Sequence, residues 1–270
     1  MIQSHHKQKD SIMATSETLR PLAVQLYSLR HLEQSLDEKL AAVASIGYAG
    51  VETIGDHGLP ASEMKALLEK HGLRAVSTHV GLQAVETELA KIIDFNQAIG
   101  NRHIVIPAIP QEQRPTDAAG WQALGQKLDR LGQQCAQAGM QLLYHNHAWE
   151  MALLDGKLAI DWLLEAADPA HLAWEPDLAW VARGGADGVE LLQRYAGRCP
   201  RIHVKDLAPA GQGEDEMGFA DVGHGTLNWD QLLPAAKAAG GEWYIVEHDL
   251  PKDPLRTIRR SFEFLQSRVG

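Results

Sequence analysis

Carboxylate and imidazole side chains stand at the ends of short apolar runs in this sequence. The runs end in Gln25, Glu52, His79, His145 with His147 and Glu150, Glu175 with Asp177, His203 with Lys205 and Asp206, and Glu247 with His248 and Asp249. A single residue of this kind is usually a hydrogen-bonding anchor for a loop. When many gather at one place they repel and desolvate one another, unless a cation or a substrate lies among them. The pattern therefore predicts a bound metal ion.

The residue types also restrict which metal is expected. Mixed carboxylate and imidazole ligation suits Mn, Co, Zn, Fe or Mg rather than a thiolate-preferring ion, and leaves the choice among them open. The two cysteines, Cys135 and Cys199, have no CxxC spacing and are too few for a disulfide framework. We expect one divalent ion held by oxygen and nitrogen ligands.

The apolar runs alternate with helical patterns, and most of these patterns stop at a glycine, a common helix C-terminal signal. This unit occurs at 41–53, 67–79, 94–107, 133–147 and 234–248. Three more runs with strand character, at 21–28, 171–177 and 199–206, lack the clean glycine stop or the preceding helix. Short strands that alternate with helices indicate βαβ units on a parallel sheet.

Eight such units, the last followed by a helical pattern at 254–269, favour a single (β/α)8 TIM barrel. A doubly wound open sheet is the alternative, but no GxGxxG or GxxxxGK[ST] loop follows any run. In a barrel the active site forms at the C-terminal ends of the strands, where the polar residues stand. We expect a barrel over residues 21–270, preceded by a disordered leader at 1–20.

Composition excludes several classes of function. Asp and Glu number 35 against 25 Lys and Arg, which argues against nucleic-acid binding, because that binding depends on neutralising phosphates. No apolar run approaches the roughly 20 residues of a membrane span, and the polar first twenty residues lack the apolar stretch of a signal peptide. We expect a soluble, cytoplasmic protein with a small-molecule substrate; a homo-oligomer is left open.

Five segments in this order and spacing resemble one known superfamily: YHNHAWE (144–150), EPDLAWVARGG (175–185), RIHVKD (201–206), DVGHGTLNW (221–229) and YIVEHD (244–249). They are similar to the xylose isomerase-like barrels of the sugar phosphate isomerase/epimerase superfamily, which includes ketose 3-epimerases, inosose dehydratase and endonuclease IV. The resemblance spans about residues 21–268 and implies a metal-dependent enzyme acting on a sugar or polyol.

The resemblance implies that His145, Asp177, His203 and Glu247 hold the metal. His145 departs from the pattern, because the epimerases have a Glu there that both binds metal and moves a proton. Glu150, five residues on, is then a substitute ligand or a substrate contact. Epimerisation with two bases needs a carboxylate on each face of the substrate carbon, so this departure keeps a second reaction in view.

For the chemistry, the resemblance implies an isomerase or epimerase that abstracts an α-proton and passes through a metal-bound enediolate. The expected catalytic residues are Glu247, Glu150 and Lys205, with Lys205 either donating to the oxyanion or merely forming a salt bridge. The expected substrate-binding residues are Gln25, Glu52, His79, His147, Trp180 and His224. The alternatives are a lyase or dehydratase of a keto-sugar or inosose and, more remotely, a non-catalytic sugar-binding barrel or a DNA-repair endonuclease.

The segment 208–229 is too long for an ordinary connection between a strand and its helix, and its glycines and acidic residues predict a lid. His224 stands at its turn, where it either faces the substrate or another subunit or is a plain turn residue. Trp149 and Trp180 either stack on a sugar ring or cap the core.

Overall fold

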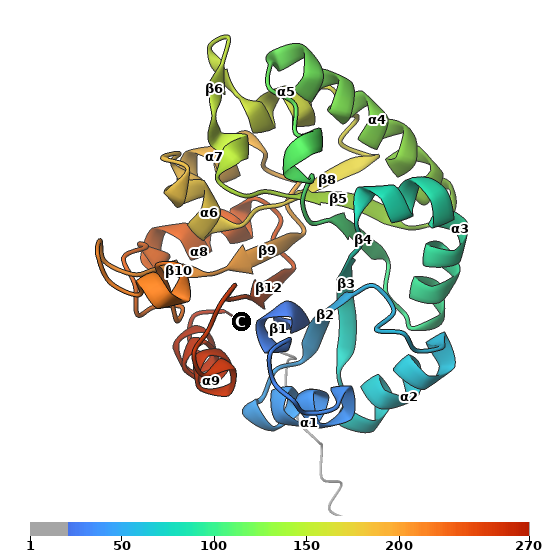
Figure 1. Cartoon of the computed structure of the whole chain (residues 1–270), viewed down its shortest axis with the longest axis vertical. Helices are drawn as coiled ribbons and strands as arrows, with labels where there is room; N and C mark the ends of the chain where they lie inside the picture. The colour runs from blue at the N-terminus through green and yellow to red at the C-terminus, as the bar shows by residue number, and fades with distance from the viewer. Residues whose placement is uncertain (1–20, 270) are drawn as a thin grey trace, which may run out of the picture.

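Eight parallel strands form a nearly closed barrel surrounded by helices (Figure 1). The computed structural model describes residues 21–269, so the predicted leader lies outside the described residues. In spatial order the strands are β8 (Leu172–Glu175), β5 (Gln141–His145), β4 (His103–Ile106), β3 (Arg74–His79), β2 (Gly50–Ile54), β1 (Leu22–Gln25), β12 (Trp243–Val246) and β9 (Arg201–Val204). The prediction of a single (β/α)8 barrel is confirmed.

The ring closes between β8 and β9, the two ends of the eight-stranded order. The backbone N–H of Trp174 donates to the carbonyl of Arg198 at 2.8 Å, and that of His203 to the carbonyl of Pro176 at 2.9 Å. A parallel bridge then pairs Asp177 with His203. Because β5 pairs with β8 and β12 pairs with β9, this closure places β5, β8, β9 and β12 side by side.

The helices cover the outside of the barrel (Figure 1). Their bounds are α1 (Leu36–Ile46), α2 (Ala61–His71), α3 (Leu82–Ala98), α4 (Ala118–Gln137), α5 (Ala159–Glu165), α6 (Leu178–Arg183), α7 (Gly188–Arg194), α8 (Trp229–Ala238) and α9 (Pro254–Leu265). The glycine stops act as predicted: α1 ends at Gly47 with φ 115° and α2 at Gly72 with φ 65°, conformations that side chains with a Cβ rarely adopt.

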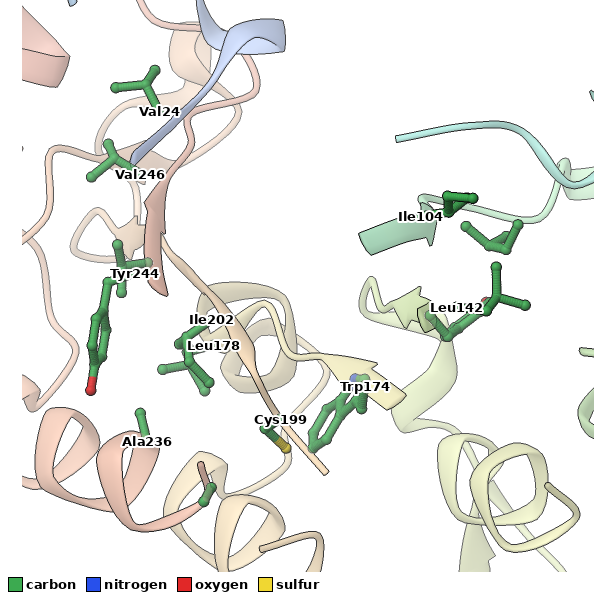
Figure 2. Close-up of a cluster of buried hydrophobic side chains, with 14 of the residues drawn as sticks. Val24, Ile104, Leu142, Trp174, Leu178, Cys199, Ile202, Ala236, Tyr244 and Val246 are labelled. Atoms are coloured by element: carbon green, nitrogen blue, oxygen red, sulfur yellow. The ribbon is translucent and has the colours of Figure 1, made fainter. Parts of the chain in front are cut away.

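Alternate side chains of each strand point outward and form the main core. Figure 2 shows Ile104, Leu142, Trp174 and Ile202 of four strands in this cluster, together with Leu178 of α6 and Ala236 of α8. The intervening positions face the barrel axis, where they form two small apolar clusters. These clusters contain Ala23, Val76 and Ile245, and Val105, Leu143 and Ala173.

Polar residues occupy the next inward positions toward the C-terminal ends. Two residues beyond Ala23, Leu143, Ala173 and Ile245 come Gln25, His145, Glu175 and Glu247. Side chains alternate along a strand with period two, so all four share the inward direction of the apolar layer below them. The same alternation that forms the core therefore also places these polar residues together at the C-terminal mouth of the barrel.

The long segment after β9 has structure of its own. Strands β10 (Asp206–Leu207) and β11 (Phe219–Ala220) pair antiparallel around a 3-10 turn, η4 (Glu214–Glu216). A second small hairpin, β6 (Leu153–Leu154) with β7 (Lys157–Leu158), follows β5, and three further 3-10 turns are η1 (Leu26–Leu29), η2 (Gln111–Gln113) and η3 (Trp149–Met151). Within residues 21–269, no helix is both long and apolar enough to cross a membrane.

Candidate metal centre

Four buried side chains meet at the C-terminal mouth of the barrel. His145, Asp177, His203 and Glu247, here called the upper group, each offer a ligand atom, and these atoms all lie within 4.8 Å of one another. They come from β5, β8, β9 and β12 or the residues just after them, the four strands that closure places side by side. The residues expected to hold a metal are therefore adjacent in space.

The upper group fits a divalent ion by its chemistry. It offers two imidazoles and two carboxylates, a donor set that mid-series divalent ions accept. His145 Nδ1 is buried without a hydrogen-bond partner among the described residues, and the nearest carboxylate oxygen, Glu175 Oε1, lies 3.4 Å away. Buried polar atoms are rarely left so, because each costs about 1–3 kcal/mol. A cation bound to His145 Nδ1 would remove that cost.

A second set, the lower group, lies one layer deeper and shares two residues with the first. It consists of His79, His145, Glu175 and His203. Glu175 Oε1 lies 2.9 Å from His79 Nε2 and 3.1 Å from His203 Nε2. Asp177 is two residues nearer the mouth than Glu175, so it lies at the rim with the upper group while Glu175 lies in the layer below.

His203 connects the two layers through its two ring nitrogens. Nδ1 lies 3.2 Å from Glu247 Oε2, whereas Nε2 lies 2.6 Å from Glu52 Oε2. Gln25 Nε2 donates to the same Glu52 oxygen at 2.7 Å. Burial opposes a charge on His203, but Glu175 and Glu52 raise its pKa well above the ordinary value. In this protonated ring Nδ1 also carries a proton, which a cation bound to the upper group would displace, while Nε2 keeps its proton toward Glu52.

Lys205 is completely buried among three carboxylates. Its Nζ lies 2.8 Å from Glu247 Oε2, 2.9 Å from Asp177 Oδ2 and 2.6 Å from Asp249 Oδ2. Burial disfavours the ammonium, yet Asp177, Asp249 and Glu247 raise the pKa of Lys205 well above its usual range. A fixed positive charge thus stands beside the upper group.

A cavity of about 290 Å³ opens onto these residues. Its polar lining is His79, His145, His147, Glu247 and Asp249, and its outer lining is Tyr27, Ile54, Gly81, Pro107 and Ala108. A volume at the lower end of ligand pockets suits a single small polar molecule. Glu247 is the residue of the upper group that, with His145, reaches this space.

Aromatic rings form one wall beside the cavity. The rings of His147 and Trp149 stack with centroids 4.2 Å apart, and Trp180 lies 5.1 Å from His147. Burial, together with the charges of His145 and Lys205, lowers the pKa of His147 to about 2, so its imidazole is neutral. The guanidinium of Arg114 lies 3.4 Å from the ring centroid of Trp149 and holds that indole in place.

This fold and site can be compared with known proteins. A family model described as xylose isomerase-like TIM barrel matches residues 40–268. The chain belongs to this family. The resemblance inferred from the five sequence segments is therefore confirmed.

Individual members of the xylose isomerase-like family share less than a third of their residues with this chain in the matches that follow. Inosose dehydratase of Geobacillus kaustophilus is 29% identical over 195 residues, which are 63% of this chain and 62% of that protein. Inosose dehydratase of Lacticaseibacillus casei is 24% identical over 257 residues, 83% of each chain. A solved sugar phosphate isomerase/epimerase from Parabacteroides distasonis superposes with a TM-score of 0.78 at 21% identity, covering 96% of this chain and 98% of that one. At this identity the last similarity shows the fold alone.

Within this family barrel, Glu150 does not join the upper group. Both of its carboxylate oxygens are occupied: Tyr144 Oη donates to Oε1 at 2.6 Å, and the backbone N–H of His147 donates to Oε2 at 2.7 Å. His145 completes the group in its place. Glu150 shapes the loop that carries His147, and its assignment as a base or ligand finds no geometric support among these contacts.

Glu150 makes the stability of the barrel depend on pH. Burial raises its pKa to about 7, although hydrogen bonds from Tyr144 and His147 oppose the rise. The native state therefore keeps a proton that the unfolded chain has lost, so this contribution to stability is full at low pH and is lost as pH rises through about 7. We expect the free energy of unfolding to fall by on the order of 3 kcal/mol from pH 4 to 8 because of Glu150.

Urea unfolding across this pH range, compared with Glu150→Gln, isolates the effect. The amide keeps the shape and cannot ionise, so the variant should show a flatter profile than the wild type. Parallel profiles would show that Glu150 does not carry the buried proton.

Of the other predicted residues, some line the cavity and others hold the residues that line it. His79 and His147 line the cavity, while Gln25 and Glu52 lie beneath it and hold His203. The Trp180 ring lies 5.6 Å from Lys205 Nζ, within reach of a cation–π contact. His224 is exposed in a turn and does not line the cavity.

The structure adds residues that the sequence reasoning did not single out. Asn146 Oδ1 accepts from the backbone N–H of Asp177 at 3.0 Å and from Trp174 Nε1 at 3.1 Å, which fixes the loop that carries a predicted ligand. Asn146 stands between His145 and His147 in the sequence. Because side chains alternate along a strand, this position predicts that Asn146 points away from the cavity and supports the site from behind. Tyr27 and Arg114 come from other loops, and no local pattern marks them.

Asp206 is a strand-end acid with a purely structural use. It accepts hydrogen bonds from the backbone N–H of Gly223 and Leu227 and from Trp229 Nε1 at 2.7–3.0 Å. The segment 208–229, predicted as a lid, is thereby fixed at its base. Its tip contacts α6, where Arg183 donates to the carbonyl of Met217 at 2.7 Å.

Proposed function

We propose that this chain is a metal-dependent enzyme that removes the proton next to the carbonyl of a keto-sugar or keto-polyol and then expels a β-hydroxyl group. The observation that carries the proposal is Glu247, a carboxylate that belongs to the upper group and also lines the cavity. That the curated relatives include inosose dehydratases supports a substrate of this class.

His145, Asp177, His203 and Glu247 would hold the ion. When bound, a divalent ion supplies polarisation of the substrate carbonyl, which makes the neighbouring C–H more acidic. Glu247 then accepts that proton, and the ammonium of Lys205, 2.8 Å from Glu247 Oε2, stabilises the negative charge that develops. The charged residues around Lys205 hold it in the protonated form that this role requires.

Elimination also needs an acid for the leaving hydroxyl. Asp249 lines the same cavity, and burial raises the pKa of its carboxyl group. The C–H electrons form the new C=C bond, the C–O bond breaks, and the hydroxyl leaves as water with a proton from Asp249. Base and acid are two residues apart on one strand end, an arrangement that suits removal of H and OH from one side of the substrate.

Epimerisation, our first expectation from the sequence, is the second candidate. It needs a second proton carrier on the other face of the substrate carbon, and the strand-five carboxylate that the epimerases use is replaced by His145. His147 supports this reading, because its Nδ1 is buried without a hydrogen-bond partner among residues 21–269 and its ring lines the cavity. A neutral imidazole there has a free nitrogen that can accept a proton, and its pKa of about 2 makes it a weaker base than Glu247 or an ordinary histidine.

One experiment separates the two reactions. Enzyme loaded in turn with Mn, Co, Zn, Fe and Mg is incubated in D₂O with an inosose, a ketose and a 3-keto-sugar, and the products are identified by NMR and mass spectrometry. We expect deuterium exchange at the α-carbon together with a product lighter by one water. Exchange with a change of configuration and no loss of water would establish the epimerase instead, and absence of exchange from every substrate would contradict both.

A further inference from the structure

A larger cavity lies at the opposite mouth of the barrel. It has a volume of about 520 Å³ and is lined by the first residues of four strands, Arg74, His103, Arg201 and Trp243, and by parts of α2 and α3. The metal centre stands at the other ends of the same strands. This N-terminal cavity plays no part in the proposed reaction.

The N-terminal cavity is positively charged in an acidic protein. Its lining contains Lys65, Arg74, Arg102 and Arg201 against one carboxylate, Glu69, while the chain as a whole carries a net charge of −10. In the part of the chain that the structure describes, Lys65, Arg74 and Arg102 form no salt bridge. Unpaired cations gathered at one opening attract an anion with more than one negative charge.

The buried side chain of Arg201 forms the base of the cavity. Its side chain is 5% exposed, and its guanidinium is fixed by the carbonyl of Val76 at 2.8 Å and by Glu242 at 2.8 Å. With the carbonyl of Pro200 and His103 Nδ1, these partners take four of the five N–H groups of a guanidinium, so one Nη2 hydrogen in a fixed direction is left for an anion.

His103 beside it adds a neutral donor. Its Nδ1 accepts from Arg201 Nη2 at 2.8 Å, and burial and the charge of Arg201 keep its pKa at about 3. The ring hydrogen therefore sits on Nε2, which has no hydrogen-bond partner among residues 21–269. An oxygen of a bound ligand could accept the hydrogen bond from His103 Nε2.

One part of the remaining wall is apolar, with Leu68, Leu73, Ile99 and Trp243, and Gln97 and Asn101 add polar groups. We propose that the N-terminal cavity binds a phosphate monoester, with the phosphate at Arg74, Arg102 and Arg201 and the organic part against this apolar wall. The phosphate dianion matches the planar donor fork of arginine, and the cavity is too large for inorganic phosphate alone.

Calorimetric titration of the full chain tests the proposal with four probes: inorganic phosphate, glucose 6-phosphate, adenosine 5′-monophosphate and glucose. At least one monoester should bind more tightly than inorganic phosphate, and glucose should not bind. The affinity should be the same with and without a chelator, because the cavity does not involve the metal centre. Binding that disappears with the metal would assign the phosphate to the metal centre and overturn the proposal, as would no binding of either monoester.

Two matched variants control for general electrostatics. Arg74→Glu/Arg102→Glu should weaken monoester binding by about tenfold or more. Arg256→Glu/Arg259→Glu makes the same change in net charge on exposed residues of α9 and should leave the affinity within a factor of about two. Equal losses in both variants would mean a non-specific surface effect. If circular dichroism shows that the first variant is poorly folded, the single variant Arg102→Gln takes its place. The monoester should shift the NMR signal of His103 in the wild type and not in Arg102→Gln, and an unchanged shift would overturn the proposal.

Discussion

Replacing Glu247 by Gln lowers the rate of solvent exchange into the substrate by about 10² to 10⁴, the usual effect of removing a general base. The amide preserves the shape of the side chain and an oxygen that can still contact the ion, but it cannot accept the substrate proton. Metal content should therefore fall much less than activity. The measurement is deuterium incorporation by NMR on enzyme whose metal content has been determined.

The control for this variant is Asp249→Asn, which changes a carboxylate of the same cavity. Under the proposed elimination it should slow the loss of water more than the exchange of the α-proton. If Glu247→Gln keeps nearly full exchange, Glu247 is only a ligand, and His147 becomes the better candidate for the base.

Replacing His203 by Ala should abolish metal binding altogether. This residue offers Nδ1 to the upper group and is held by Glu52 through Nε2, so its loss removes a ligand and takes one of their partners from the buried Glu52 and Glu175. Metal present at 100 times its dissociation constant stabilises the wild type by about 2.7 kcal/mol. Thermal unfolding with and without metal should show this gain in the wild type and not in the variant.

His224→Ala is the matched histidine control, because His224 is exposed and lies outside the cavity. It should keep the metal content and the metal-dependent rise in melting temperature. His203→Gln, which keeps a donor for Glu52, separates loss of the ligand from loss of folding. Full metal occupancy in either His203 variant would contradict the upper group, and also the lower group, because both contain His203.

Much of the fold could be predicted because its signals are local. Gly47 and Gly72 end helices by adopting positive φ, which side chains with a Cβ disfavour, so the glycine stops marked true boundaries. Period-two alternation likewise accounts for the inward direction of Gln25, His145, Glu175 and Glu247. Both effects depend on a few neighbouring residues and can be seen in any one stretch of sequence.

The choice between His145 and Glu150 could not be made in this way. The two residues are five apart on either side of the loop after β5, and both had suitable chemistry. Tyr144, on the outward side of β5, and the backbone N–H of His147 take up both oxygens of Glu150. This depends on how the loop turns, which the sequence pattern does not specify.

The sequence by itself determined the family, the barrel and the strand ends at which reactive residues collect, because these follow from backbone propensity and alternation. Tertiary structure alone decided which residues meet. Closure between β8 and β9 brings His203 beside Asp177 and places Lys205 among three carboxylates. The barrel as a whole also brings Arg74, Arg102 and Arg201 together at its N-terminal mouth. Distances between residues far apart in the chain are set by how the sheet closes, and no local pattern contains them.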